Sequence, residues 1–503
     1  MLVGALLLFR LLSAALVVTQ PGYTDAYYYA DVAKRLAAGQ GLSADFIWNF
    51  LEATGPLPVP SHRFWMPLAT ALQAGGIAGL PFLDPFHAAQ AAEILVACLI
   101  PVVTYLAARS VGGSATTAMI AAALAGLGGA FAPGWVSLDA FAPAAVIGGT
   151  FFLLYRRAAS GDVRFGALAG LAVGLLFLAR AEGALFGLAL LPLVRHERSR
   201  IAGALGAAVA LAIGLAWLGR DLSLGAGPDL LARSVLLVRY EDFFAVDTSV
   251  GIMGLPAVSW GQFTAALPDV LIAKVAALGT NAVTLLFAFG LLLVPGIARR
   301  AWSHRDRPDV RAFTGLLVLV YLAESLLFTL HSTRGSYFHS LAALLPYGVA
   351  LGVVGTGELL RSDGGRRLAA AAGLAAAVIL STFAVAQWDA SFNGPYRERV
   401  AIVSRIPAGT FMAIDSAAWR WIAGRPVIVT PANLHPCAIG LAADYEVVTL
   451  VLERVHFTSY ESLYRGTPDP LTMDYVGPPT RIGDVQLYPV DAGRARSICS
   501  GQL

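Results

Sequence analysis

The stretch GYTDAYYYA, residues 22–30, lies directly after the first hydrophobic segment of the chain. That segment, residues 2–19, is long enough to cross a bilayer as a helix, and Pro21 and Gly22 end it. Asp25 then follows close to the lipid headgroups, beside three tyrosines of the kind that gather at membrane interfaces. The stretch predicts a helical membrane protein with a carboxylate at a membrane face and a surface helix over residues 31–42.

The composition of the whole chain supports a membrane protein. Of its 503 residues, 57% are hydrophobic and 13% are charged, whereas about a quarter of the residues in a soluble domain are charged. The net charge of +3 says little about partners, because the information lies in where the positive residues are placed, and we expect no nucleic-acid partner. The abundance of Ala, Gly and Arg beside few Lys residues is typical of a high-GC bacterium, which predicts a location in the cytoplasmic membrane.

The apolar runs that could span a bilayer number about eleven, at roughly 17–25 residues each. One apolar stretch, residues 165–194, is interrupted by Arg180-Ala-Glu182-Gly183, and charges at mid-membrane are costly. We therefore expect two short helices joined by a charged turn there. The full set of expected helices covers residues 2–19, 87–108, 114–132, 140–157, 165–179, 183–195, 201–219, 271–297, 312–330, 337–355 and 367–386.

The arginines in the short loops orient these helices. With a cytoplasmic N-terminus, every arginine-rich short loop falls on the cytoplasmic side, as the positive-inside rule requires. The same topology places three larger pieces outside, at residues 20–86, 220–270 and 387–503. The sequence thus predicts a transmembrane domain over residues 1–386, with external loops 20–86 and 220–270, and an extracytoplasmic domain over residues 387–503.

The C-terminal piece changes in composition and alternates strand-like and helix-like runs, which predicts a small α/β domain. It contains no glycine-rich phosphate-binding motif, so a capping or acceptor-positioning role without chemistry is the favoured interpretation. Cys437 and Cys499 both fall in this piece and could form a disulfide if it lies outside. The expected strands are residues 410–414, 426–429, 446–452 and 485–488, and the expected helices are residues 416–423 and 434–443.

Two carboxylates are the first candidates for chemistry. Asp25 lies at the outer end of the first helix, and Asp139 lies at the outer start of the fourth. The competing interpretation of Asp25 is an interfacial or helix-capping residue, and that of Asp139 is the N-cap of its helix. Together at one external cavity they could accept a proton, hold an acceptor or bind a divalent metal, and spacing does not decide among these roles. We assign no metal ligand and require no cofactor, while leaving a divalent metal open.

Basic side chains on the same predicted face could bind a phosphate. His331 and Arg334 lie between the ninth and tenth helices, and Arg180 lies in the turn after the fifth. The competing interpretations are contact with lipid headgroups and, for Arg180, a pair with Glu182. The residues we assign to positioning of the acceptor or the loops are His62, Arg63, Glu182, Tyr27 and Tyr337, and the second loop contributes residues 239–244.

The order of five short motifs resembles the GT-C superfamily of membrane glycosyltransferases, in particular family-39-like bacterial relatives of protein O-mannosyltransferases and of the lipid A aminoarabinose transferase. No motif is specific alone, and their order and shared predicted exposure carry the resemblance. The motifs are TDAYY at residues 24–28, AGQGL at 38–42, FWMPL at 64–68, LDAF at 138–141 and ARAEG at 179–183.

The resemblance implies transfer of a hexose or pentose from a polyprenyl-phosphate donor to a hydroxyl of a glycan, lipid or protein, with inversion, at the outer face of the membrane. Family members carry a catalytic aspartate in the first external loop, which maps onto Asp25, and often a second acid, which maps onto Asp139. Many relatives have two adjacent acids in the first loop. Here Ala26 follows Asp25, which weakens a metal site in that loop.

Two other classes of protein stay open. A proton- or ion-coupled transporter is favoured by charged residues within the predicted helices, although most of these lie toward helix ends, where snorkelling suffices. A membrane assembly protein without catalysis would need neither aspartate at a cavity. The charged residues in question are Arg10, Glu93, Lys274 and Glu324.

Overall fold

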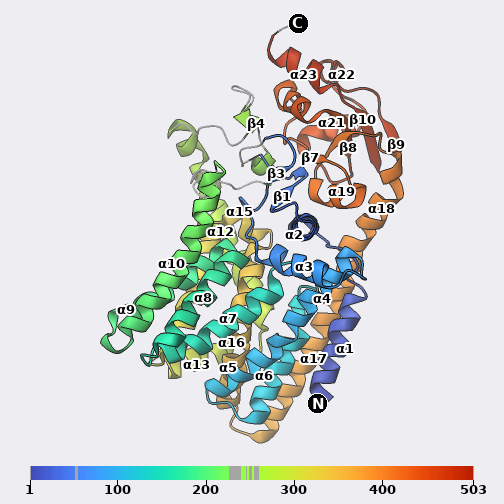
Figure 1. The fold of residues 1–503 in the computed structure, drawn as a ribbon. Helices are drawn as coiled ribbons and strands as arrows, with labels where there is room; N and C mark the ends of the chain where they lie inside the picture. Colours follow the sequence, from blue (N-terminus) through green and yellow to red (C-terminus); the bar gives the residue numbers. More distant parts are fainter. Residues whose placement is uncertain are drawn as a thin grey trace. The chain divides into compact units, whose positions relative to one another are not determined.

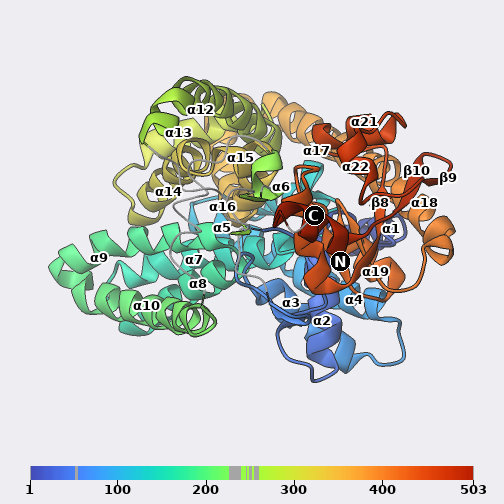
Figure 2. The ribbon, with the colours of Figure 1, turned by 90° about the horizontal axis from the view of Figure 1, so that it is seen from above.

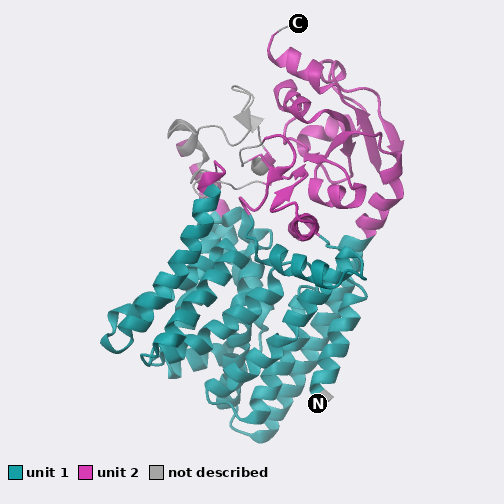
Figure 3. Ribbon diagram, viewed as in Figure 1, with its two compact units in different colours: residues 1–22, 65–221, 274–393 teal, residues 23–64, 222–273, 394–503 magenta. Residues whose placement is uncertain are grey.

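The computed structural model describes residues 2–50, 55–225, 240–244, 246–247, 252–253 and 260–501. The chain divides into two compact units (Figure 3). We call them the helical unit, Met1–Gly22, Trp65–Asp221 and Lys274–Asn393, and the α/β unit, Tyr23–Phe64, Leu222–Ala273 and Gly394–Leu503. The α/β unit thus includes parts of both predicted external loops, and Arg239 of the second loop lies outside the described residues. The predicted domain boundary after residue 386 stays a prediction.

The helical unit is a bundle of apolar helices whose long members run side by side (Figure 1). Among the described residues, five helices are long and apolar enough to cross a membrane: Pro85–Ser110, Glu197–Ser223, Leu267–Phe289, Ser336–Leu359 and Asp363–Arg405. Three shorter apolar helices cover Val3–Ala15, Ala115–Phe131 and Val163–Ala179. The chain is therefore a helical protein with several candidate membrane spans, and the count of eleven stays a prediction.

The elements of this bundle overlap the predicted apolar runs, although the runs 87–108, 271–297 and 312–330 are each divided between two helices. The bundle contains α1 (Leu2–Ala15), α3 (Leu68–Gly79), α4 (Pro85–Ala97), α5 (Leu99–Ser110), α6 (Ala115–Leu127), α7 (Phe141–Ala158), α8 (Val163–Ala179), α9 (Leu191–Arg195), α10 (Arg200–Ser223), α13 (Val294–Ser303), α14 (Pro308–Leu326), α15 (Thr329–Thr333), α16 (Ser336–Leu359), α17 (Asp363–Trp388) and, from Lys274 on, α12 (Trp260–Phe289). Viewed from above, α7, α8 and α9 group on one side, and α13 and α14 group on another (Figure 2).

Helix α16 forms the core of the helical unit. Of its most apolar 18-residue stretch, 83% is buried, the largest share among the candidate spans. It packs against α5, α7 and α13. Gly148 lets α7 approach it closely, since a Cβ there would lie 2.1 Å from the backbone oxygen of Ala343. Glycine at such crossings lets backbones approach, which is how helices pack tightly in lipid.

The segment after α8 differs from its prediction. Residues 183–195 were expected to form a short helix, but α8 ends at Ala179, Arg180 is extended, and a 3₁₀ run covers Ala181–Leu190 before the short α9. A Cβ on Gly183 would lie 2.3 Å from the backbone of Leu176, so the turn folds back tightly on α8. This turn carries both Arg180 and Glu182.

The α/β unit contains a six-stranded mixed sheet in the order β2-β7-β6-β8-β10-β9. Strand β6 (Thr410–Ala413) is parallel to both β7 (Val427–Val429) and β8 (Val447–Leu452). Strand β10 (Val485–Pro489) is antiparallel to β8 and to the edge strand β9 (Thr480–Ile482). Helices α18 (Gly394–Ile402), α19 (Ser416–Ala423), α20 (Pro436–Gly440), α21 (Glu461–Tyr464), α22 (Pro470–Met473) and α23 (Ala492–Cys499) complete this region.

The α/β unit also contains two pairs of short strands and a disulfide. Strand β1 (Ser43–Ala44) pairs with β3 (Val59–Pro60), and β4 (Val246–Asp247) pairs with β5 (Ile252–Met253). A disulfide joins Cys437 on α20 to Cys499 on α23, the pair that the sequence left open. It closes a loop between residues 62 positions apart.

The first external segment departs from its prediction in two ways. The helix expected over residues 31–42 is α2, Thr24–Ala37, so Asp25 lies in its first turn. An acid in that turn interacts favourably with the helix dipole, and neither Gly nor Pro interrupts the run. Strand β2 (Phe46–Ile47), which no prediction included, forms the edge of the six-stranded sheet opposite β9.

Candidate functional site

Asp139 forms a buried pair with His339. Asp139 is fully buried, and its Oδ2 lies 2.9 Å from Nε2 of His339 on α16. Its Oδ1 accepts a hydrogen bond from the backbone nitrogen of Ala140. Helix α7 begins at Phe141 without a side-chain cap, so the alternative interpretation of Asp139 as an N-cap is wrong.

Both ring nitrogens of His339 face oxygen atoms. Nδ1 of His339 lies 2.8 Å from the carbonyl oxygen of Gly335, which can only accept, so Nδ1 carries a proton. The carboxylate of Asp139 faces the other ring nitrogen at 2.9 Å. His339 thus links Asp139 to the start of α16.

A second polar group forms around Arg180 and Glu182. Nη2 of Arg180 lies 3.2 Å from Oε1 of Glu182 and 3.0 Å from Oγ of Ser336. Ser336 Oγ also lies 2.7 Å from Oε1 of Glu182. The pair that the sequence offered as the alternative role of Arg180 is thus present. Burial raises the pKa of the Glu182 carboxyl, but the Arg180 charge and the Ser336 hydrogen bond outweigh it and hold this pKa below its ordinary value.

Glu324 on α14 extends this group. It is fully buried, and its Oε1 lies 3.1 Å from Oγ of Ser336 and 2.7 Å from Oγ of Ser340. Its Oε2 has no hydrogen-bond partner among the described residues. Its burial places Glu324 inside the bundle.

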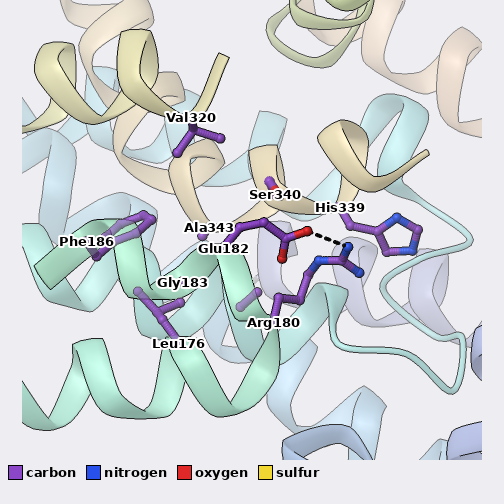
Figure 4. A pocket seen from close by; sticks show the side chains of 10 residues that line it. Leu176, Arg180, Glu182, Gly183, Phe186, Val320, His339, Ser340 and Ala343 are labelled. Atoms are coloured by element: carbon purple, nitrogen blue, oxygen red, sulfur yellow. Dashed lines mark hydrogen bonds and ion pairs between the residues drawn. The ribbon is translucent and has the colours of Figure 1, made fainter. Parts of the chain in front are cut away.

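A pocket in the helical unit joins both groups (Figure 4). Arg180, Glu182, His339 and Ser340 supply its polar wall. The guanidinium of Arg180 lies between the carboxylate of Glu182 and the ring of His339 (Figure 4). The remaining lining is apolar: Ala144, Leu176, Gly183, Phe186, Val320 and Ala343. The cavity has a volume of about 20 Å³, which is room for about one water molecule beside these charged and apolar walls.

His331 and Arg334 lie at the end of α15 and just beyond it. Burial lowers the pKa of His331 to about 4; the charge of Glu182 opposes this shift, and that of Arg180 adds to it. His331 is therefore neutral near pH 7 and can offer a phosphate a hydrogen bond but no charge. Arg334 is exposed.

Three predicted residues, Tyr27, His62 and Arg63, lie with Asp25 in the α/β unit. Asp25 is half-buried in the first turn of α2, and Tyr27 is buried near Arg399. The backbone nitrogen of His62 donates to the hydroxyl of Tyr28, and the His62 ring stacks with Tyr29 at 6.1 Å between centroids. His62 and Arg63 are both buried, which fits a role in holding the loop.

Tyr337, predicted to position an acceptor or a loop, is fully buried in the helical unit beside Tyr321, with 6.0 Å between ring centroids. His339, Ser336 and Ser340 were not among the predicted site residues. Their spacing was a usable signal, because residues three and four apart on one helix share a face. All three lie in the first turns of α16.

Solved structures share this fold. The Archaeoglobus fulgidus oligosaccharyltransferase AglB, in complex with an inhibitory peptide and a dolichol-phosphate, matches 98% of this chain and 77% of its own at 14% identity, with a TM-score of 0.54. ArnT from Cupriavidus metallidurans, bound to undecaprenyl phosphate, matches 97% of this chain and 98% of its own at 13% identity, with a TM-score of 0.55. Both are GT-C membrane glycosyltransferases, so the predicted resemblance to the GT-C superfamily is confirmed at the level of the fold.

No protein-family model and no curated protein sequence matches the chain. At identities of 13% and 14%, the likeness concerns the fold and not the substrate.

Proposed function

We propose that this protein is an integral membrane glycosyltransferase that moves a sugar from a polyprenyl-phosphate donor to an acceptor hydroxyl, with inversion. The observation that carries the proposal is the fold likeness to ArnT, which extends over 97% of this chain and 98% of ArnT, a protein whose structure holds undecaprenyl phosphate. AglB, of the same fold, holds a dolichol-phosphate. We further propose that the chain crosses the membrane about eleven times with its α/β unit outside, as the positive-inside rule indicates.

The proposed reaction needs few groups. The acceptor oxygen attacks the anomeric carbon, the bond from that carbon to the phosphate oxygen breaks, and the carrier phosphate leaves with the electron pair. Because the phosphate carries its charge well, no strong general acid is required. The proton of the acceptor hydroxyl needs a base, and we assign this role to Asp25 because of its place in the first external segment.

The donor phosphate needs hydrogen-bond donors and positive charge. We assign Arg180 as its principal contact, since the planar guanidinium suits phosphate and lies in a pocket with an apolar lining. His331 and Arg334 are further candidates, with His331 as an uncharged donor. We assign Asp139, through its pair with His339, to holding the acceptor or supporting the base. A carboxylate and an imidazole are also ligand types that divalent cations accept.

A proton-coupled transporter is the second candidate, favoured by two fully buried carboxylates in the helical unit. Glu93 accepts a hydrogen bond from Gln73 at 3.2 Å, and Glu324 contacts Ser336 and Ser340. Buried acids of this kind are typical of proton pathways. Unlike an enzyme, a transporter would leave the lipid-linked sugar intact.

The test uses the purified full-length protein in membrane lipids, with radiolabelled sugars on undecaprenyl phosphate as donors and crude membrane lipids, glycans and proteins as acceptors. We expect transfer of label by the wild type and none by Asp25→Asn, at equal thermal stability. A chelator arm tests the need for a divalent metal. Full activity in Asp25→Asn would remove Asp25 from the reaction. Donors that bind without cleavage would favour the transporter.

A further inference from the structure

Residues of the first external segment complete the sheet of the α/β unit. Strand β2 pairs in parallel with β7, with Phe46 opposite Val427 and Ile47 opposite Ile428. The hydroxyl of Ser416 at the start of α19 donates to the carbonyl oxygen of Ile47 at 2.8 Å. The segment that carries Asp25 is therefore part of the same folded body as residues 394–503.

The C-terminal half of α2 is held by ion pairs to α19 and to the loop before β2. Nη1 of Arg35 lies 2.5 Å from Oδ2 of Asp45, and Nη2 of Arg420 lies 3.3 Å from the same oxygen. Nε of Arg420 also lies 3.8 Å from Oδ2 of Asp31, which is 1% exposed. These contacts fix the last turns of α2 against the start of the sheet.

The N-terminal end of α2 is held by a different network. The hydroxyl of Thr24, the first residue of α2, donates to Oδ1 of Asp415 at 3.2 Å. Asp415 is the N-cap of α19, accepting from the backbone nitrogen of Ala418, and its Oδ2 lies 3.2 Å from Nη1 of Arg399. Arg399 in turn makes a bidentate contact with Glu453, at 2.8 and 3.1 Å.

This network has little freedom to rearrange. The side chains of Arg399, Asp415 and Glu453 are each less than 20% exposed. Burial opposes the charge of Arg399, but the carboxylates of Glu453 and Asp415 outweigh it and raise the pKa of Arg399, so its charge is permanent. Bidentate pairs fix orientation as well as distance. The position of Thr24 Oγ1 is thus set by side chains that the rest of the α/β unit holds in place.

We propose that the C-terminal part of the chain positions Asp25, with Thr24, Asp415 and Arg399 as positioning residues. This inference rests on the proposed function, because it gives Asp25 the role of base. Asp25 directly follows Thr24, so a shift of the first turn of α2 moves its carboxylate. A misplacement of about 1 Å can reduce a rate by about 100-fold. The C-terminal region thus takes part in catalysis without supplying a reacting group.

The test compares Thr24→Val with Thr24→Ser in the full-length protein, with undecaprenyl-phosphate sugars as donors. Valine keeps the shape and removes the hydroxyl, whereas serine keeps the hydroxyl. We expect Thr24→Val to lower kcat by about 10- to 100-fold with the KM for donor changed by about twofold or less, and Thr24→Ser to retain kcat within about threefold. Hydrogen exchange of α2 amides should rise in Thr24→Val alone.

Thr472→Val is the matched control. The Thr472 hydroxyl donates to Oδ2 of Asp469, an N-cap residue of the same unit, at 2.7 Å. This variant removes an equivalent bond away from α2 and should leave kcat and the exchange of α2 unchanged. Equal loss in Thr472→Val, or in Thr24→Ser, would overturn the positioning role. Wild-type kcat in Thr24→Val beside an inactive Asp25→Asn would overturn this inference alone. An active Asp25→Asn would overturn this inference and the role of Asp25 as base, whereas the absence of transfer by the wild type would overturn the proposed function.

Discussion

Replacement of Arg180 tests the pocket of the helical unit most directly. The side chains of Arg180 and Glu182 are 12% and 14% exposed, so Arg180→Met leaves the Glu182 carboxylate largely buried without its cation. Breaking a buried pair on one side costs about 3–5 kcal/mol, because the remaining charge is uncompensated. Arg180→Met/Glu182→Gln removes both charges, and we expect it to recover all but about 1–2 kcal/mol of this loss.

The donor affinity should behave differently from the stability. A hydrogen bond to a charged group contributes about 1.5–3 kcal/mol, so loss of Arg180 should raise the KM for the donor by about 10- to 100-fold. The double variant removes the same contact and should keep this defect although its stability recovers. Thermal denaturation in detergent measures the first quantity, and transfer from undecaprenyl-phosphate sugars measures the second.

Arg307→Met is the control for this pair of variants. Nη2 of Arg307 lies 2.6 Å from Oδ2 of the buried Asp309, so its loss should also lower the denaturation midpoint. Because Arg307 lies in a predicted cytoplasmic loop, Arg307→Met should leave the KM for the donor unchanged. A double variant as unstable as Arg180→Met would refute the charge-balance reasoning. An unchanged KM in both Arg180 variants would show that Arg180 does not contact the donor.

Two further predictions concern stability. Cys499→Ser removes the disulfide, which closes a loop over 62 residues. The loss of chain-entropy stabilisation should lower the free energy of unfolding by about 4 kcal/mol. Limited proteolysis of the α/β unit should become faster, and an unchanged rate would contradict this prediction. The pKa of His331 falls from 6.5 to about 4 on folding, so the stability that its neutral form contributes is complete above pH 6.5 and is lost as pH falls through 4. His331→Gln should therefore lose less thermal stability than the wild type between pH 7 and pH 4, and equal losses would count against this assignment.

The helices of the bundle could be predicted because hydrophobic length is written locally in the sequence. Each predicted run overlaps a helix or, at residues 183–195, a 3₁₀ run followed by α9. The start of α6 at Ala115 and the end of α8 at Ala179 fall within a residue of the prediction. Boundaries that depend on packing were less accessible, as the tight turn at Gly183 shows.

The contacts of the candidate site could not be predicted, because they join distant parts of the chain. Asp139 and His339 are 200 residues apart, and Arg180 and Ser336 are 156 apart. The local sequence identified Asp139 and Arg180 as polar residues in apolar surroundings. Their partners depend on how α7, α8 and α16 cross, which the local sequence does not specify. Edge strand β2 was missed for the same reason, since two residues paired with a remote strand carry no periodic signal.

The pairing of β2 with β7 also orders events during folding. Ile47 accepts a hydrogen bond from Ser416 across 369 residues, so this contact cannot form until residue 416 has been made. Most helices of the bundle lie between residues 47 and 416 in the sequence. They would therefore enter the membrane first, since synthesis runs from the N-terminus. Helix α2 gains its contacts with Arg420 and Asp415 only afterwards. The placement of Asp25 is therefore a late step, and a chain truncated before residue 394 would carry this aspartate without the side chains that fix it.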